Sequence, residues 1–261
     1  MFGESLIIAL SMYSAIPMPR VDWREDNMRW SLACLPVVGV LAGGLLFGWA
    51  ALAGHTAMQP VFFAAVAVLL PILLSGGFHM DGFLDAADGI FSRRDHQRRL
   101  EIMKDPHCGP FAVACCGGLL LLQLGAWCQL AAISRLLPVA CGAFVFSRCL
   151  TVTAGSRFPY TPTSTLGVLF ADRASKKVGT IGIVETAAAA LLLLGIGWLS
   201  AGLSGLLAAA GMAAAALLVF FWFARMTRRA FGGVTGDLLG FLVEVSETAQ
   251  LFTLALISLF V

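Results

Sequence analysis

Charged residues are scarce in this chain of 261 residues, of which only 12% are charged and 59% are hydrophobic. A soluble globular domain usually carries about 25% charged residues, so this composition excludes one. The net charge of +2 is too small for a nucleic-acid-binding surface, and the hydrophobic fraction is too high for a disordered chain. The composition therefore predicts a polytopic membrane protein that binds no nucleic acid.

Three long stretches lack Asp, Glu, Lys and Arg altogether, namely 30–80, 106–134 and 186–224. An apolar helix needs about 20 residues to cross the hydrocarbon core, so the first and third stretches each hold two crossings. Their turns are predicted near His55 with Gln59-Pro60, and between Ser200 and Ser204. Only helices and closed barrels span a membrane, and these runs are continuous rather than alternating. We therefore expect an all-α fold, a polytopic integral membrane helical bundle.

The predicted bundle has about seven transmembrane helices and forms a single transmembrane domain over residues 1–261. The helices are expected near 31–51, 61–80, 110–133, 138–154, 178–198, 202–224 and 238–259. Residues 5–16 form a shorter apolar helix that ends at Pro17 and Pro19, and it crosses, re-enters or lies flat. This segment has no basic residues before it and no A-x-A-like cleavage site, which disfavours a signal peptide.

Basic residues are concentrated in alternate loops. The segments 17–29, 81–108, 155–177 and 225–237 hold 15 of the 17 Lys and Arg residues. The positive-inside rule places such loops in the cytoplasm, and their alternation supports the predicted number of helices.

An acidic group stands out at 81–105, where 11 of the 32 charged residues lie directly after an apolar span. On a helix, Asp81, Asp85 and Asp88 sit at about 0°, 40° and −20°, so three carboxylates share one face. A bound divalent cation is the simplest compensation for their repulsion, and oxygen ligands favour Mg²⁺, Mn²⁺ or Ca²⁺. The alternative is a solvated helix end. Gly82 and Gly89, a heptad apart, would allow a close approach of backbone or substrate.

A second charged part follows, in which Glu101 and Asp105 have helical spacing and Lys104 lies alongside. Asp105 stands at the mouth of the next predicted span, where it could meet the three aspartates across a helical hairpin. Arg98 and Lys104 are candidate phosphate contacts, since both side chains bind phosphate. The alternative for the basic residues is anchoring to anionic lipid. His79 faces away from the acidic face and is interpreted as an ordinary interfacial histidine.

Two further charged positions lie in or beside predicted spans. Arg148 lies within an apolar span, where an unpaired charge costs at least about 2.5–3.5 kcal/mol, so it should face the bundle interior and find an acid or a phosphate. The alternative is snorkelling to the interface. Asp237 and Glu244 are seven residues apart and share a helix face, although Asp237 could equally serve as an N-cap or dipole partner.

With these residues assembled, the chain closely resembles the cobalamin synthase family, the adenosylcobinamide-GDP ribazoletransferases of cobalamin biosynthesis. The resemblance covers nearly the full chain. It is carried by the strings Gly76-Gly77-Phe78-His79-Met80-Asp81-Gly82-Phe83-Leu84-Asp85-Ala86-Ala87-Asp88-Gly89, Arg98-Arg99-Leu100-Glu101-Ile102-Met103-Lys104-Asp105-x-x-x-Gly109, Ile16-Pro17-Met18-Pro19, Phe158-Pro159-Tyr160 and Gly232-Gly233-Val234-Thr235-Gly236-Asp237. After Phe-Pro-Tyr the family usually continues with Ala-Arg-x-x-Gly-Leu-Gly, whereas residues 161–167 here read Thr-Pro-Thr-Ser-Thr-Leu-Gly.

The resemblance implies a Mg²⁺-dependent transferase of the bacterial inner (cell) membrane with its active site facing the cytoplasm. It would join adenosylcobinamide-GDP to α-ribazole, or to α-ribazole 5′-phosphate, and release GMP. We expect the acidic and basic segment at 76–109 to be catalytic. The expected metal ligands are Asp81, Asp85, Asp88 and Asp105. The expected catalytic residues are Asp105, Glu101 and Lys104, and either Asp105 or Glu101 would accept a proton. The expected substrate-binding residues are Arg98, Arg148, Gly82, Gly89, Asp237 and Glu244.

The expected partners are the corrinoid nucleotide, ribazole and the lipid bilayer. The sequence leaves open whether the protein forms homo-oligomers or contacts other enzymes of the cobalamin pathway. Two alternative functions share features with this sequence. A membrane CDP-alcohol phosphotransferase of lipid headgroups uses similar metal chemistry, but Asp85 stands where its Asp-Gly-x-x-Ala-Arg motif needs alanine. An ion-coupled transporter would place its acids near the midplane, often with repeat symmetry, whereas these lie at the end of a span beside basic residues.

Overall fold

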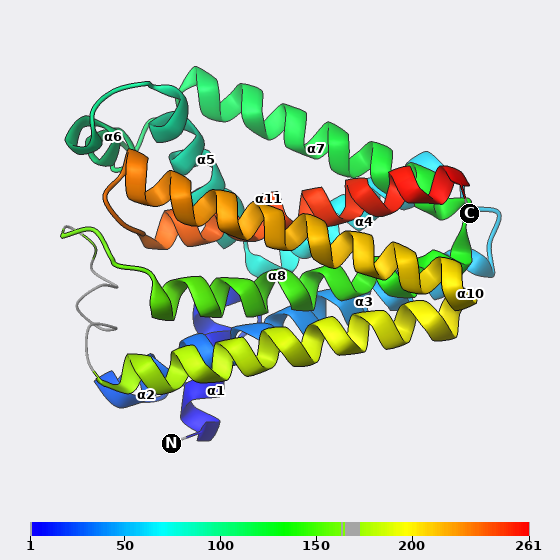
Figure 1. Cartoon of the computed structure of the whole chain (residues 1–261), viewed down its shortest axis with the longest axis horizontal. Helices are drawn as coiled ribbons and strands as arrows, with labels where there is room; N and C mark the ends of the chain where they lie inside the picture. Colours follow the sequence, from blue (N-terminus) through cyan, green and yellow to red (C-terminus); the bar gives the residue numbers. More distant parts are fainter. Residues whose placement is uncertain (1, 163, 165–172, 261) are drawn as a thin grey trace.

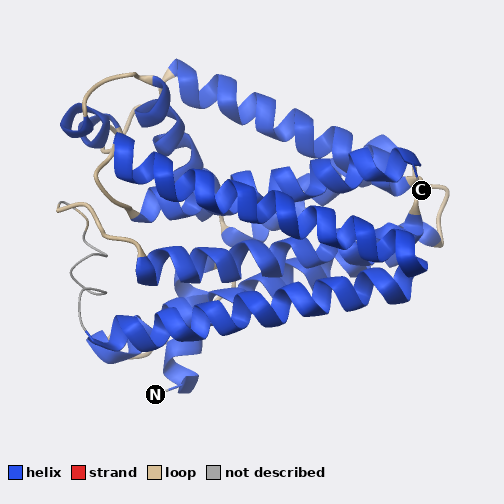
Figure 2. Ribbon diagram, in the orientation of Figure 1, coloured by secondary structure: helices blue, strands red, loops and turns tan. Residues whose placement is uncertain are grey.

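The computed structural model describes residues 2–162, 164 and 173–260, and the described chain is a bundle of helices (Figures 1 and 2). The α-helices are α1 (Phe2–Tyr13), α2 (Glu25–Ser31), α3 (Leu35–Gly54), α4 (Pro60–Ser75), α5 (Phe78–Phe91), α6 (His96–Ile102), α7 (Pro110–Ala131), α8 (Leu137–Arg157), α10 (Arg173–Ala230) and α11 (Gly236–Ile257), with short 3-10 turns at Leu32–Cys34, Ser134–Leu136 and Ser258–Phe260. The predicted all-α membrane bundle is confirmed.

Five segments of the described chain are long and apolar enough to cross a membrane: Asn27–Gly54, Pro110–Ala131, Ser134–Arg157, Lys176–Ala230 and Gly236–Phe260. The fourth is about 80 Å long as a straight helix, well beyond the thickness of a bilayer. It is interrupted at Ala201 and Gly202, whose backbone angles are not helical, and α10 doubles back there (Figure 1). The turn predicted between Ser200 and Ser204 is thus confirmed, and the total of about seven crossings stays a prediction.

The span predicted at 61–80 is wrong at its C-terminal end. Helix α4 ends at Ser75, and α5 continues at an angle of 95° to it. The bend occurs because Gly76 and Gly77 both adopt left-handed backbone angles, with φ of 63° and 81°. Two successive residues of this kind cannot continue a right-handed helix, so the aspartates of α5 belong to a separate element.

The described parts of the four basic segments lie at the same end of the bundle, on the left in Figure 1, while the C-terminus lies at the opposite end. This placement agrees with the alternation of charge in the sequence. We call this end of the bundle the basic end.

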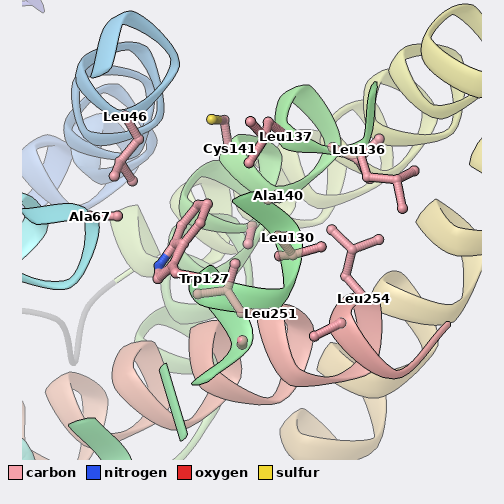
Figure 3. Packing of buried hydrophobic residues seen from close by; sticks show 14 of the residues in the cluster. Leu46, Ala67, Trp127, Leu130, Leu136, Leu137, Ala140, Cys141, Leu251 and Leu254 are labelled. Carbon is pink, nitrogen blue, oxygen red and sulfur yellow. The ribbon is translucent and has the colours of Figure 1, made fainter. Parts of the chain in front are cut away.

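The helices approach one another closely because small residues lie at their contacts. The position of a Cβ atom on Gly43 of α3 would be 2.6 Å from the carbonyl oxygen of Cys141 in α8, so only glycine fits there. Around Trp127 of α7, side chains from α3, α4, α8 and α11 form the largest core cluster, which includes Leu46, Ala67 and Leu251 (Figure 3). Packing of this kind, rather than exclusion from water, holds helices together in lipid.

Candidate active site

A cavity of about 370 Å³ opens at the basic end between α1, α5, α6 and α11. Its charged lining consists of Asp81 of α5, Lys104 just after α6, and Asp237 of α11. The rest of the lining includes apolar side chains, among them Met12 of α1 and Phe78 of α5, and the hydroxyl residues Ser164 and Thr235. The cavity therefore combines two carboxylates with one ammonium group, and we call it the charged cavity.

The two carboxylates share this cavity because α5 and α11 are in backbone contact. A Cβ atom on Gly82 would lie 2.8 Å from the carbonyl oxygen and 2.9 Å from the Cα of Asp237. Helix α11 begins at this point, where the hydroxyl of Thr235 accepts a hydrogen bond of 3.2 Å from the backbone of Leu238. Gly82 was predicted to allow close approach of backbone or substrate, and its face packs against protein backbone at the edge of the cavity.

A third carboxylate, Asp85, lies one turn further along α5, and the negative charges of Asp237, Asp81 and Asp88 all act on it. The predicted face of three aspartates therefore exists, and it is joined by Asp237 from a second helix. We refer to Asp81, Asp85 and Asp237 as the α5–α11 carboxylates.

Asp88 makes its hydrogen bonds elsewhere. Its two carboxylate oxygens accept hydrogen bonds from the backbone of Gly109, at 2.6 Å, and of Ala112, at 2.9 Å. These amides begin α7, where backbone N–H groups have no partner within the helix. Asp88 thus ties α5 to the start of α7, a structural role that sequence spacing did not predict.

Asp105 is exposed and pairs with its neighbour His107. Its Oδ1 accepts a hydrogen bond of 2.9 Å from the backbone of His107 and lies 2.8 Å from the ring nitrogen Nδ1. The hydrogen bonds from the backbone and side chain of His107 lower the pKa of the Asp105 carboxyl below its usual value. A carboxylate with a lowered pKa is a weak proton acceptor, which disfavours the predicted role of Asp105 as a general base.

The remaining residues predicted around α6 have different surroundings. Arg98 and Glu101 form an exposed ion pair with each other at 2.8 Å. Gly89 packs against α6, where a Cβ atom would lie 2.8 Å from the side chain of Met103. Among the site residues predicted in and directly after α6, only Lys104 lines the charged cavity.

The carboxylates that line the charged cavity could supply some, but not all, of the ligands of a metal ion. Among the described residues, no three His, Cys, Asp or Glu side chains lie close enough together to hold one metal ion, so the four predicted ligands are not gathered into one site. Mg²⁺ commonly takes only one or two carboxylates and completes its shell with water and substrate phosphates. Asp81 and Asp237, which line the same cavity from two helices, fit that pattern.

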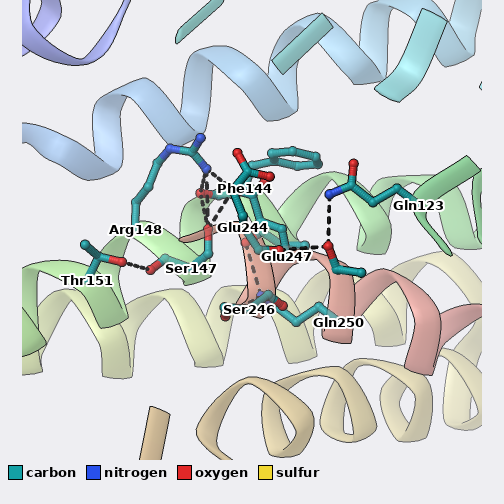
Figure 4. Close-up of polar contacts among 11 residues, drawn as sticks. Gln123, Phe144, Ser147, Arg148, Thr151, Glu244, Ser246, Glu247 and Gln250 are labelled. Atoms are coloured by element: carbon teal, nitrogen blue, oxygen red, sulfur yellow. Dashed lines mark hydrogen bonds and ion pairs between the residues drawn. The ribbon is translucent and has the colours of Figure 1, made fainter. Parts of the chain in front are cut away.

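Arg148 lies deep in the bundle and is paired with an acid, as the sequence suggested. It is 2% exposed and forms an ion pair and hydrogen bond with Glu247 of α11, while Ser147 donates a hydrogen bond of 2.9 Å to the same carboxylate (Figure 4). The charges of Arg148 and Glu247 also act on the buried Glu244. Arg148 and Glu244 thus belong to a buried network, away from the charged cavity.

The sequence interpretation missed three contributors. Glu247 lies three residues after Glu244 on the same helix face, and this spacing could have marked it as the partner of Arg148. Met12 and Tyr13 of α1 line cavities at the basic end, but no local signal indicates which helix α1 contacts.

Two of the motifs quoted from the sequence meet in space. The backbone of Val234 donates to Pro159 at 2.9 Å, and the backbone of Thr161 donates to Val234 at 3.1 Å. The Phe-Pro-Tyr segment is therefore hydrogen-bonded through its backbone to the extended residues that directly precede α11. Most of the divergent loop at 161–167 lies outside the described residues.

A multi-pass bundle with a charged cavity at its basic end defines the class of this molecule as a polytopic helical membrane protein. The chain belongs to the cobalamin-5-phosphate synthase family, whose model matches residues 5–255. The expectation of a membrane-spanning transferase of cobalamin biosynthesis is thereby confirmed.

Several relatives are similar over nearly their whole length. An adenosylcobinamide-GDP ribazoletransferase of Lachnoclostridium phytofermentans is 36% identical over 244 residues, which cover 94% of this chain and 90% of that protein. An adenosylcobinamide-GDP ribazoletransferase of Pseudomonas savastanoi pv. phaseolicola is 36% identical over 257 residues, covering 96% and 98%. One of Geobacillus kaustophilus is 32% identical and covers 93% and 91%. No solved structure shows significant similarity to this chain.

Proposed function

We propose that this protein is a Mg²⁺-dependent adenosylcobinamide-GDP ribazoletransferase of the bacterial inner membrane, with its active site at the cytoplasmic face. It joins adenosylcobinamide-GDP to α-ribazole or α-ribazole 5′-phosphate and releases GMP. The observation that supports this most directly is the charged cavity, in which Asp81, Asp237 and Lys104 meet in a chain of this family.

In the proposed reaction, a ribose hydroxyl oxygen forms a bond to the phosphorus that carries cobinamide. The bond from this phosphorus to the bridging oxygen of the diphosphate breaks, and GMP leaves with that oxygen. The hydroxyl proton passes to one of the α5–α11 carboxylates. Transfer of this kind depends mainly on positioning and on neutralising phosphate charge.

The chain's own residues have distinct parts in this scheme. Lys104 binds the diphosphate through its ammonium group, and Asp81 and Asp237 would hold Mg²⁺, which supplies positive charge for the phosphates and the leaving group. Gly82 keeps the two carboxylates at a fixed separation, since α5 cannot shift against α11. Glu101 is committed to Arg98 and Asp105 to His107, so neither is the preferred proton acceptor.

The test adds adenosylcobinamide-GDP, α-ribazole and Mg²⁺ to membranes that contain the protein and measures GMP. We expect GMP release that is abolished by EDTA and restored by Mg²⁺. Asp81→Asn and Asp237→Asn should each lower kcat by about 100-fold or more, while Asp22→Asn, which alters a carboxylate with 84% of its side chain exposed, should match the wild type.

Two outcomes would contradict the proposal. Release of CMP from a CDP-alcohol, with none of GMP, would favour the lipid-headgroup alternative. Activity in intact right-side-out vesicles, with activity in inverted vesicles only after permeabilisation, would place the site on the opposite face.

A further inference from the structure

His79 of α5 is buried, but within the described chain neither of its ring nitrogens has a hydrogen-bond partner. Its exposed fraction is 3%, so the ring is shielded from bulk solvent. An imidazole in this state is costly, because a buried polar group without a partner loses its hydration and gains nothing in return. The sequence interpretation of His79 as an interfacial histidine is therefore wrong, and the unpartnered ring requires an explanation.

The surroundings of His79 form a second, largely aromatic cavity. The ring stacks on that of Tyr13, with centroids 6.4 Å apart, and meets Phe78 edge-on at 5.5 Å. Leu35 and Leu239 line the same space. We call it the aromatic cavity; among the described residues that line it, the imidazole is the only basic side chain and none is acidic.

The aromatic cavity adjoins the charged cavity. Met12, Phe78 and Gly236 line both of them, so one extended ligand could occupy the two together. The aromatic cavity has a volume of about 30 Å³, which is room for a water molecule but not for a bicyclic ring. A bicyclic ring therefore enters only when side chains at the shared wall, such as Met12 and Phe78, turn aside.

We propose that the aromatic cavity binds the benzimidazole base of the ribazole acceptor and that His79 is the positioning residue that donates a hydrogen bond to its free ring nitrogen. This inference rests on the proposed function. The base stacks among Tyr13 and Phe78, which offer the apolar faces that a flat ring needs. Its ribose then extends across the shared wall into the charged cavity, towards Lys104 and the carboxylates. The hydrogen bond gives one of the two ring nitrogens a partner, which neither has in the described chain without substrate.

The test compares two acceptors that differ in a single ring atom: α-ribazole and the same riboside of 5,6-dimethylindole, in which carbon replaces the free nitrogen. A site that hydrogen-bonds a substrate atom rejects the analogue that lacks it, since a buried donor is left unpartnered. We expect wild-type kcat/KM to be at least about tenfold higher for α-ribazole.

The variants assign this preference to one residue. His79→Phe should reduce the ratio between the two acceptors to about one, while the KM for adenosylcobinamide-GDP stays within about threefold of the wild type. His79→Gln keeps a donor and should restore part of the ratio. A general loss of structure would lower kcat/KM for both acceptors together and leave the ratio unchanged.

Each result separates this inference from the proposed function. If the wild type uses α-ribazole but treats the indole riboside equally, or if His79→Phe keeps the wild-type ratio, the role of His79 is overturned and the transferase function stands. If the wild type uses neither acceptor, the transferase function itself fails. Should His79→Phe not fold, the wild-type ratio and His79→Gln still decide the matter.

Discussion

Replacing Gly82 with alanine tests how closely α5 must approach α11. The new methyl group would lie 2.8 Å from the carbonyl oxygen of Asp237, about 0.6 Å closer than the 3.4 Å of an ordinary contact. The obstructing atoms belong to backbone, so they cannot turn aside as a side chain would. Overpacking of this kind costs about 1–3 kcal/mol, and the better helix propensity of alanine offsets up to about 1 kcal/mol of that. We therefore expect a net loss of up to about 3 kcal/mol in stability.

Activity should fall more steeply than stability in this variant. A shift of about half an ångström between Asp81 and Asp237 spoils the geometry of the charged cavity, so kcat for GMP release should drop by roughly tenfold or more. Gly44→Ala is the matched control, because a Cβ atom there meets nothing within 4 Å. Thermal unfolding of both purified variants in detergent, together with GMP release, makes the comparison. If Gly82→Ala behaves like Gly44→Ala in both assays, the close approach of α5 and α11 does not position the site.

Three further outcomes are expected. Arg148→Met should lower the free energy of unfolding by about 3 kcal/mol, because it leaves a buried carboxylate unpaired, and adding Glu247→Leu should recover most of the loss in the same thermal assay. A double variant as unstable as the single one would contradict this. Asp88→Asn should cost about 0.5–2 kcal/mol of stability by weakening the start of α7 yet keep GMP release within about tenfold of the wild type; a complete loss of turnover would instead indicate a metal ligand. The exposed Cys108 should react with a membrane-impermeant maleimide in inverted vesicles and not in right-side-out vesicles, and the reverse pattern would invert the topology.

Much of the fold could be predicted because a bilayer limits the possible structures. The charge-free stretch from 106 to 134 predicted a helix at 110–133, and α7 occupies Pro110–Ala131. The reversal near Gly202 was visible as a break in an otherwise uniform run of alanine and leucine. The elbow at Gly76 and Gly77 was missed because the residues around it stay apolar, and hydropathy does not report the direction of the backbone.

The candidate site could be predicted only where it depends on the spacing of residues within one helix. Spacing within one helix placed Asp81 and Asp85 on a common face of α5. It could not show that Asp237 joins them, since that depends on which helix packs against which. The same limit applied to Glu247 and to Tyr13, whose contacts join segments far apart in the chain.

Gly76 and Gly77 are glycine for a different physical reason from Gly82. At Gly76 and Gly77 the requirement is chirality, since their φ angles suit a D-amino acid as well as they suit glycine, and an added Cβ atom meets at most an ordinary contact with Ala15. At Gly82 the requirement is size alone, since its backbone is helical and any methyl group collides. An asparagine, which tolerates left-handed angles, could therefore substitute at the elbow, whereas no residue other than glycine suits the crossing with α11.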